Sequence, residues 1–260
     1  MATPVKLIIS GCAGRMGQRI ATLVREQPSG GLVVASAVEA PGHPAIGQDL
    51  GALLGASPFG VIVVDDVRWA LGRGEVLIEF TRPSPTLEHV RIATELRKPM
   101  VIGTTGFQDG ERAIIQEAAA QIPIVLSPNM SLGVNVLFEL ATLAAQRLGL
   151  RYDVEIVETH HKAKQDSPSG TAKRLAEAVA AGRGVASNSI PMHALRVGDV
   201  VGDHTVVFAG PSERIELTHR AQSRDVFALG ALKAAQFVHR QRPGLYDMTD
   251  VLKAHVEPHG

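Results

Sequence analysis

Several common features are scarce in this sequence, and each shortage excludes a class of protein. Only one of its 260 residues is a cysteine, Cys12, so no intramolecular disulfide can form and a reducing compartment is suitable. The first residues lack the charged and apolar regions of a signal peptide, and apolar runs such as 61–64 are far too short to cross a bilayer. We therefore expect a cytoplasmic protein that has no membrane partner.

The sequence also has no excess charge and few aromatic side chains. Lysine plus arginine and aspartate plus glutamate each number 26, and aromatic residues make up 4% of the chain. The balanced charge argues against a general polyanion binder, and the shortage of aromatics argues against base stacking. We expect no nucleic-acid partner, although a local basic pocket is compatible with this composition.

The first half of the chain alternates short apolar runs with amphipathic stretches of helical period. Strands are predicted at 5–10, 32–38, 75–80, 100–103 and 122–127, and helices at 15–26, 85–97 and 109–120. Strands that are apolar throughout and alternate with helices are typical of a parallel sheet covered on both faces. The pattern predicts the α/β class, with a Rossmann-like doubly wound sheet in a dinucleotide-binding domain over 1–131.

The pattern changes after 131, where β-rich runs follow one another without helices between them. Helices are predicted at 131–148, 169–181 and 226–239, and strands at 152–158, 192–196, 205–209 and 214–220. Adjacent strands of this kind indicate an antiparallel or mixed sheet. We predict a second, α+β domain over 132–241, with 242–260 returning to complete the first domain.

A glycine-rich loop follows the first predicted strand and leads into the first predicted helix. Its glycines are Gly11, Gly14 and Gly17, a spacing related to the dinucleotide fingerprint. Glycine permits the tight turn and lets a pyrophosphate approach N–H groups at a helix N-terminus. An ordinary strand–helix turn would look similar, but Glu39 ends the second strand, where an acid can bind the adenosine ribose. This combination favours dinucleotide binding, with Cys12 as a small filler rather than a nucleophile.

Glu39 also bears on the choice of cofactor. Its carboxylate should repel the 2′-phosphate of NADPH, and the next residue, Ala40, is not an arginine that could accept that charge. Arg15, in the first turn of the helix, could compensate. We expect NADH to be favoured, with NADPH as the alternative.

Two further stretches come after predicted strands on the same side of the sheet, where doubly wound folds bind ligands. Their small, hydroxylated residues and glycines would let a nicotinamide ring lie close to the backbone, although ordinary turns have a similar composition. The residues concerned are Phe80 and Thr81, and then Gly103, Thr104 and Thr105. A third stretch, which includes Ser127, Pro128, Asn129 and Met130, lies where the two domains would join and could serve both as a hinge and as a contact for the amide of the cofactor.

The most unusual segment, THHKAKQDSPSGTA at 159–172, lies between a predicted strand and a predicted helix. The helix mouth at Ser169, Gly170 and Thr171 can present N–H groups and a hydroxyl to an anion, and Lys162 and Lys164 add positive charge. Because the sequence has no second phosphate loop, the expected anion is a carboxylate. A protonated imidazole in the segment can polarise an oxygen or a ring nitrogen of the ligand.

This segment also has plainer interpretations. Its histidines could be structural, its lysines could belong to a solvated loop, and the serine could be an ordinary N-cap. A zinc site is disfavoured because His160 and His161 are adjacent and no thiol cluster accompanies them, so we expect no metal. The crowding of these groups in a chain that also carries a dinucleotide loop favours a functional site.

The order of these motifs resembles that of the 4-hydroxy-tetrahydrodipicolinate reductase family, also called dihydrodipicolinate reductase. The shared stretches are GCAGRMG, FTRP, GTTGF, SPNMSLGVN, ETHHKAKQDSPSGTA, GDHTVVF and GLYDMTDVL, which together extend over nearly the whole chain. The resemblance implies an NAD(P)H-dependent oxidoreductase of diaminopimelate and lysine biosynthesis. Its small dicarboxylate substrate loses water and accepts a hydride to give tetrahydrodipicolinate. The family is typically a homotetramer assembled through its substrate domain.

Carried over by position, the resemblance implies that His160 is the catalytic histidine and Lys164 the proton donor. His161, Gly170 and Thr171 match positions that bind the substrate carboxylates. The matching cofactor positions are Gly11, Cys12, Ala13, Gly14, Arg15, Met16, Glu39, Gly103, Thr104, Thr105, Ser127, Pro128, Asn129 and Met130.

Two features of the chain depart from the family pattern, and two other functions stay open. Ala40 stands where members that use NADPH well often have an arginine, and the connection before Val197 is short. A different two-domain amino-acid or semialdehyde dehydrogenase would keep the glycine loop but has no need of the paired histidines. A dinucleotide-sensing protein without catalysis would tolerate the loss of Lys164.

Overall fold

The computed structural model describes residues 3–27 and 30–255 of the chain. They form two compact units, of which the first comprises the described residues of Met1–Met130 and Phe227–Gly260 and the second is Ser131–Val226. The sequence predicts a second domain that continues to 241, so the structure corrects its end to Val226. Of the predicted return at 242–260, residues 256–260 lie outside the described part.

The first unit is built on a parallel sheet of seven strands in the order β11-β6-β5-β4-β1-β2-β3. The strands are β1 (Val5–Ser10), β2 (Leu32–Val38), β3 (Val63–Val64), β4 (Val76–Glu79), β5 (Met100–Ile102), β6 (Pro123–Leu126) and β11 (Gly244–Tyr246). After β3 the chain returns to the other side of β1, so the strand order reverses between β1 and β4. Ligands of doubly wound sheets bind at the carboxyl ends of strands at such a point.

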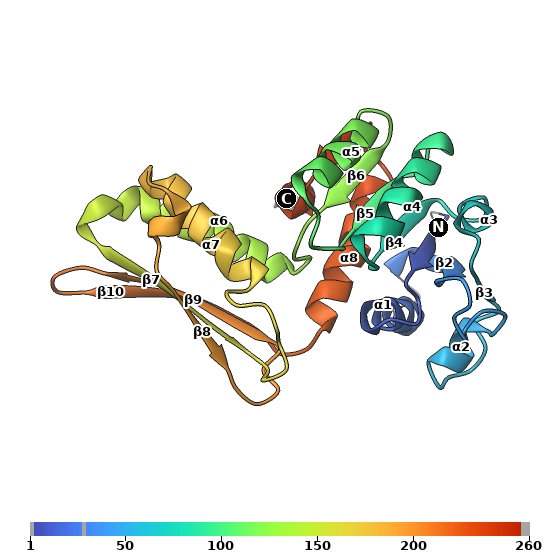
Figure 1. Cartoon of the computed structure of the whole chain (residues 1–260), viewed down its shortest axis with the longest axis horizontal. Coiled ribbons are helices and arrows are strands. Elements are labelled where there is room, and N and C mark those ends of the chain that lie inside the picture. Colours follow the sequence, from blue (N-terminus) through green and yellow to red (C-terminus); the bar gives the residue numbers. More distant parts are fainter. Residues whose placement is uncertain (1–2, 28–29, 256–260) are drawn as a thin grey trace. The chain divides into compact units, whose positions relative to one another are not determined.

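Helices cover both faces of this sheet (Figure 1). The helices of this unit are α1 (Arg15–Glu26), α2 (Leu50–Leu53), α3 (Val67–Leu71), α4 (Pro83–Glu95), α5 (Asp109–Ala119), α8 (Asp225–Val238) and α9 (Met248–His255). Val90 of α4 and Ile115 of α5 are fully buried against Leu77, Ile102 and Ile124 of the sheet. Burial on both faces explains why these strands are continuously apolar. No strand or helix was predicted at α2, α3, β3, β11 or α9, because each is too short to show a clear period.

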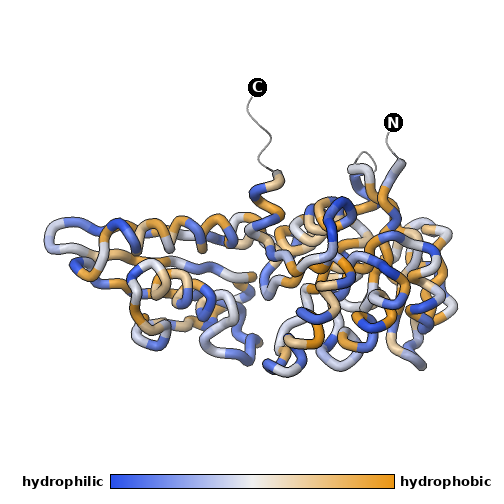
Figure 2. Tube along the Cα trace, turned by 90° about the horizontal axis from the view of Figure 1, so that it is seen from above, coloured by the Kyte–Doolittle hydropathy of each residue, from blue (hydrophilic) through white to orange (hydrophobic). Residues whose placement is uncertain are grey.

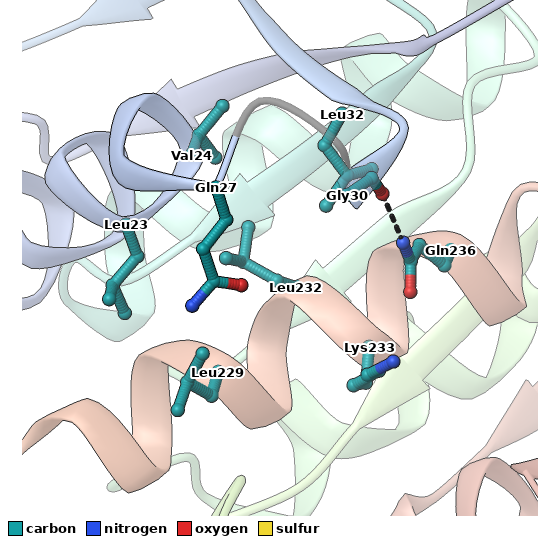
Figure 3. Close-up of a pocket in the computed structure, with 9 residues that line it drawn as sticks. All are labelled: Leu23, Val24, Gln27, Gly30, Leu32, Leu229, Leu232, Lys233 and Gln236. Atoms are coloured by element: carbon teal, nitrogen blue, oxygen red, sulfur yellow. Dashed lines mark hydrogen bonds between the residues drawn. The ribbon is translucent and has the colours of Figure 1, made fainter.

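Helix α8 belongs to the first unit, although the sequence placed it in the second. A Cβ added at Gly230 would overlap the carbonyl oxygen of Met130, so the two backbones are in direct contact. Figure 3 shows Leu229 and Leu232 beside Leu23 of α1 around a pocket of about 70 Å³, and Gln236 Nε2 donates to Gly30 O at 2.6 Å. An amphipathic pattern shows that a helix is buried on one face, but not which sheet it covers.

The second unit has a mixed sheet of four strands in the order β10-β9-β7-β8. Its strands are β7 (Asp153–His160), β8 (Met192–Arg196), β9 (Gly202–Ala209) and β10 (Arg214–Ala221), and its helices are α6 (Leu132–Leu148) and α7 (Gly170–Arg183). Strand β7 pairs parallel with β8 and antiparallel with β9. Both helices lie over one face of the sheet (Figure 1). The second unit also has 3₁₀ helices at Gly149–Arg151 and Ser187–Ser189.

Strands β7 and β9 of the second unit each extend beyond their predicted bounds to include a buried histidine. Strand β7 continues through Glu158 to His160, and β9 begins at Gly202 instead of 205, so that it includes His204. In both strands every second residue is buried, and these three polar residues keep that alternation. The predicted strands ended at 158 and began at 205, so His160 and His204 lay just outside them.

Hydrophobic and hydrophilic stretches alternate along the traces of both units (Figure 2). Among the described residues, no helix is long and apolar enough to span a membrane.

Candidate active site

The predicted dinucleotide loop joins β1 to α1 in the first unit. Gly11 has φ +72, which favours glycine, and its N–H donates to Val38 O of β2 at 3.0 Å. A Cβ at Gly11 would lie 2.8 Å from Phe80 O, and one at Gly17 would overlap Gly11 O. Glycine is therefore required at both positions by the close approach of backbone to backbone.

The start of α1 fits a phosphate group. Among the described residues, the first turn of α1 has no acidic side chain, and its N-cap, Gly14, makes no side-chain capping hydrogen bond. The N–H groups at a helix start attract anions, and no side-chain cap competes for them here. The loop can therefore hold the pyrophosphate of a dinucleotide. Arg15 is exposed at the start of the same turn.

Glu39 lies beside this loop, as the sequence predicted. Its Oε2 accepts a hydrogen bond from Ala13 N at 3.0 Å, and its Oε1 accepts one from Ala40 N at 2.9 Å. The carboxylate is thus held at the end of β2, where an adenosine ribose would lie in this fold class. Cys12 is fully buried, and burial raises the pKa of its thiol to about 12, so it is not a thiolate nucleophile near neutral pH.

The other predicted cofactor positions follow β4, β5 and β6. Thr81 N donates to Thr104 Oγ1 at 3.2 Å, and the ring of Phe80 covers Gly103 so closely that a side chain at Gly103 would collide with it. Thr104, Thr105 and Pro128 help to line a pocket of about 90 Å³. Ser127 Oγ donates to Asn129 O at 2.8 Å and shapes the segment that ends at buried Met130. The structure therefore gathers these stretches at one edge of the sheet.

A buried acid–histidine pair lies under this edge and was missed by the sequence analysis. Glu79, at the end of β4, is fully buried, and its Oε2 lies 2.7 Å from His89 Nδ1 of α4. Ser10 Oγ donates to Glu79 Oε1 at 3.2 Å, and Thr81 Oγ1 donates to the same oxygen. These contacts hold the ends of β1 and β4 together directly below the glycine loop.

In the second unit, His160 and Glu158 lie on the buried face of β7. His160 is 7% exposed, and its Nδ1 lies 3.0 Å from Glu158 Oε2. Glu158 Oε1 accepts hydrogen bonds from Ser169 N at 3.0 Å and from Arg196 Nη2 of β8 at 3.1 Å. Burial alone would raise the pKa of Glu158, but the contacts with His160, Ser169 and Arg196 outweigh it and hold that pKa well below its usual range.

His204 of β9 completes a group that we call the β7 polar cluster: Glu158, His160, Ser169, Arg196 and His204. Its Nε2 lies 3.8 Å from Glu158 Oε2, and its ring packs edge-on to His160 with centroids 5.1 Å apart. Burial lowers the pKa of His204 to about 3, and the neighbouring His160 adds to this effect. His204 is therefore neutral near pH 7.

The N-terminus of α7 differs in detail from the prediction. Ser169 is the N-cap and is 2% exposed; its Oγ accepts from Ala172 N at 3.1 Å, and its N–H is donated to Glu158. The expectation that Ser169 presents an available N–H to an anion is therefore corrected, because the buried carboxylate takes that donor. Gly170, by contrast, is exposed at the start of the helix.

The loop between β7 and α7 carries the predicted lysines. Lys164 Nζ lies 2.7 Å from Asp166 Oδ1, and the Lys164 side chain is 22% exposed. Partial burial would raise the pKa of Asp166, but Lys164 outweighs it and lowers that pKa. Lys162 is exposed and its N–H donates to Gly198 O at 3.1 Å, while His161 is half-buried. The loop therefore offers positive charge beside the helix start.

Three residues of the β7 polar cluster have the spacing of metal ligands, but the charges around them oppose a bound cation. Ligand atoms of Glu158, His160 and His204 lie within 4.8 Å of one another. However, the guanidinium of Arg196 lies 3.1 Å from Glu158 Oε1, and a cation beside a buried carboxylate opposes the binding of a second cation. The donor set therefore suits an internal ion pair better than a metal ion.

Comparison with known proteins identifies the family. The model for the N-terminus of dihydrodipicolinate reductase matches residues 5–130, and the model for its C-terminus matches residues 133–252. The chain belongs to the dihydrodipicolinate reductase family. A 4-hydroxy-tetrahydrodipicolinate reductase from Anaeromyxobacter dehalogenans is 49% identical to this chain. The match covers 95% of this chain and 97% of the length of that relative. The reductase of that name from Syntrophus aciditrophicus is 44% identical over 95% of this chain and 98% of its own.

A solved structure shares the fold of this family member. The dipicolinate-bound dihydrodipicolinate reductase from Paenisporosarcina sp. TG-14 superposes with a TM-score of 0.77 at 24% identity, covering 94% of this chain and 97% of that one. The Rossmann-like parallel sheet and the second unit with a mixed sheet, both predicted from the sequence, are confirmed.

Proposed function

We propose that the chain is a 4-hydroxy-tetrahydrodipicolinate reductase, an NAD(P)H-dependent oxidoreductase of diaminopimelate and lysine biosynthesis. The observation that carries the proposal is the segment 159–172, which joins buried His160 at the end of β7 to the mouth of α7 in a chain of this family. The dehydrogenase alternative would not need the paired histidines, and Lys164, whose loss a non-catalytic sensor would tolerate, is present.

The residues of the first unit suit the cofactor, which supplies a hydride when bound. The N–H groups at the start of α1 would hold its pyrophosphate, and Glu39 would hold the adenosine ribose. Thr104, Thr105 and the segment 127–130 would orient the nicotinamide end. We expect NADH to be preferred over NADPH, because Glu39 opposes a 2′-phosphate and Ala40 brings no positive charge.

The residues of the second unit suit a dicarboxylate. Gly170 and Thr171 at the start of α7, with Lys162 and His161 of the loop, would bind its carboxylates. Reduction of a conjugated imine needs a proton as well as a hydride, and Lys164 is the proposed proton donor. In its protonated form, His160 would polarise the reacting end of the substrate. Ser169 is assigned to capping α7 and not to direct contact.

The test is a reaction in which a synthase makes the substrate in place from pyruvate and aspartate semialdehyde. Oxidation of NADH or NADPH, followed by absorbance, should depend on the synthase, and NADH should give the higher kcat/KM. A folded protein that binds NADH but oxidises neither cofactor would overturn the proposal in favour of a sensor or another dehydrogenase. Light scattering of the same sample should give the mass of a homotetramer. We expect the protein to be located in the cytoplasm.

A further inference from the structure

Glu158 is a fully buried acid to which the proposed reaction gives no role. An ionised carboxylate inside a protein core costs several kcal/mol unless charges and hydrogen bonds compensate it. Here both oxygens have short contacts: Oε1 accepts from Ser169 N and Arg196 Nη2, and Oε2 lies 3.0 Å from His160 Nδ1. The carboxylate thus holds Ser169 and Arg196 through hydrogen bonds to Oε1 and places Oε2 against the His160 ring.

The neighbours of Glu158 belong to different elements around the loop that carries Lys164. Ser169 begins α7 at one end of this loop, and Arg196 comes from β8. Arg196 Nη2 also donates to Asp166 O at 2.6 Å, and Asp166 in turn pairs with Lys164. The Glu158 carboxylate therefore connects the sheet to the loop in two ways. It binds the N–H of Ser169 directly, and it binds Arg196, which in turn donates to Asp166 of the loop.

The same carboxylate sets the environment of the His160 ring. Nδ1 faces Glu158 Oε2, while Nε2 lies toward Gly202, where an added Cβ would be only 3.0 Å away. Neither His160 Nδ1 nor Glu158 Oε2 has a hydrogen-bond partner in good geometry, so their contact is electrostatic. A negative charge at this distance favours a proton on Nδ1 over one on Nε2. The edge-on ring of His204 limits rotation of the imidazole.

We infer that Glu158 is a positioning residue for the reduction: it fixes the orientation and tautomer of His160 and, together with Arg196, holds the Lys164 loop in place for the substrate. This inference rests on the proposed function. Glu158 would act without touching the substrate, in the way that carboxylates behind metal-bound or catalytic histidines orient those rings. A purely structural acid would affect stability alone.

The first variant, Glu158→Gln, keeps the shape of the side chain and removes its charge. We expect kcat to fall by about ten- to a hundredfold, as misplacement of reacting groups does, with the Kd for NADH unchanged. In ¹⁵N-histidine-labelled protein near pH 7.5, the His160 ring should lose its Nδ1–H signature; a His160→Gln variant assigns the signal. Circular dichroism confirms that the variants are folded.

The second variant, Arg196→Lys, keeps the charge but cannot donate to both Glu158 and Asp166 in the same way. It should raise the KM for the substrate and the Kd for dipicolinate about tenfold, the effect of one lost hydrogen bond, while the His160 tautomer stays as in the wild type. The matched control is Glu177→Gln, which removes an exposed partner of Arg174 on α7 and should change none of these values.

The outcomes separate the two proposals. Wild-type protein that fails to reduce the substrate overturns the proposed function, whereas the tautomer measurement needs no substrate and still tests Glu158. The inference is overturned if Glu158→Gln retains both kcat and the Nδ1–H signature. If Glu158→Gln does not fold, the Arg196→Lys result decides: unchanged KM and dipicolinate affinity overturn the inference, and a selective loss of both supports it.

Discussion

The Glu39 carboxylate accepts a hydrogen bond from the backbone N–H of Ala13, inside the glycine loop, at 3.0 Å. A negative charge therefore stands next to the loop that is proposed to bind the cofactor pyrophosphate, and Ala40 adds no cation beside it. The 2′-phosphate of NADPH would meet this carboxylate, while the free ribose hydroxyls of NADH can donate hydrogen bonds to it.

Replacing Ala40 with arginine should shift the cofactor preference toward NADPH. Ala40 is exposed, so the longer side chain has room, and its guanidinium can bind a phosphate in a bidentate way. We expect the ratio of kcat/KM for NADPH to that for NADH to rise about tenfold or more, as one charge-assisted contact allows. Ala40→Gln, of similar length but uncharged, is the control, and an equal effect of both variants would contradict the electrostatic explanation.

Gly17→Ala should impair cofactor binding. The added methyl group would overlap Gly11 O and press on Cys12 Cα, so the loop would have to open. We expect the Kd for NADH, measured by fluorescence titration, to rise at least about tenfold because the loop N–H groups lose their alignment. Gly110→Ala on α5, where a Cβ meets nothing within 4 Å, should leave the Kd unchanged. Equal affinity of both variants would show that the loop tolerates the shift.

Lys164→Ala should abolish most of the turnover without weakening NADH binding. Loss of a general acid typically costs a factor of about 10² to 10⁴ in rate, and the cofactor residues lie in the other unit. Steady-state kinetics and NADH titration of the same preparation test both parts. Lys173→Ala, on the α7 helix, is a control with an exposed lysine. An unimpaired kcat in Lys164→Ala would contradict the assignment of this residue.

His204 should make the protein sensitive to mild acid. Burial depresses the pKa of His204 from 6.5 to about 3, so below pH 6.5 the unfolded chain binds a proton that the folded chain rejects. Stability is therefore fully present above pH 6.5 and falls as the pH drops toward 3, by about 2 kcal/mol from this group at about pH 5. Glu158, whose pKa is lowered, remains ionised over this window.

The measurement for His204 is urea unfolding, followed by circular dichroism, at about pH 7.5 and about pH 5. The loss of stability between the two conditions should be smaller in His204→Gln than in the wild type. The exposed His193→Gln variant should match the wild type, because its ring lies on the surface beside Glu155. The same acid sensitivity in His204→Gln and the wild type would show that His204 accepts a proton in the folded state.

Gly230→Ala should destabilise the first unit. The new methyl group would overlap Met130 O, where α8 packs against the end of the β6 loop, and overpacking of this kind costs about 1–3 kcal/mol. Thermal unfolding should occur at a lower temperature in this variant than in Gly110→Ala. A Tm equal to that of the wild type would show that α8 can move away from this segment without loss.

The sequence by itself determined the longer local elements and the contiguous motifs of the candidate site. The glycine loop, the acid at the end of β2 and the segment 159–172 are contiguous patterns, so their chemistry is visible before any fold is known. Long periodic helices such as α1 (Arg15–Glu26) and α6 (Leu132–Leu148) were predicted to within a residue at each end, because their apolar spacing is sustained over several turns.

Only the tertiary structure decided which distant residues meet. Arg196 and His204 reach Glu158 because β8 and β9 pair with β7 on either side, and no local pattern specifies that pairing. The same holds for α8. Its apolar face does not specify which sheet it covers, and the contact of Gly230 with Met130 places it on the first unit. The sequence predicted that the N–H of Ser169 would donate to a bound anion. In the structure this N–H donates instead to the buried carboxylate of Glu158, 11 residues earlier. Local periodicity fixes which face of an element is buried, whereas strand pairing and close packing determine what it is buried against.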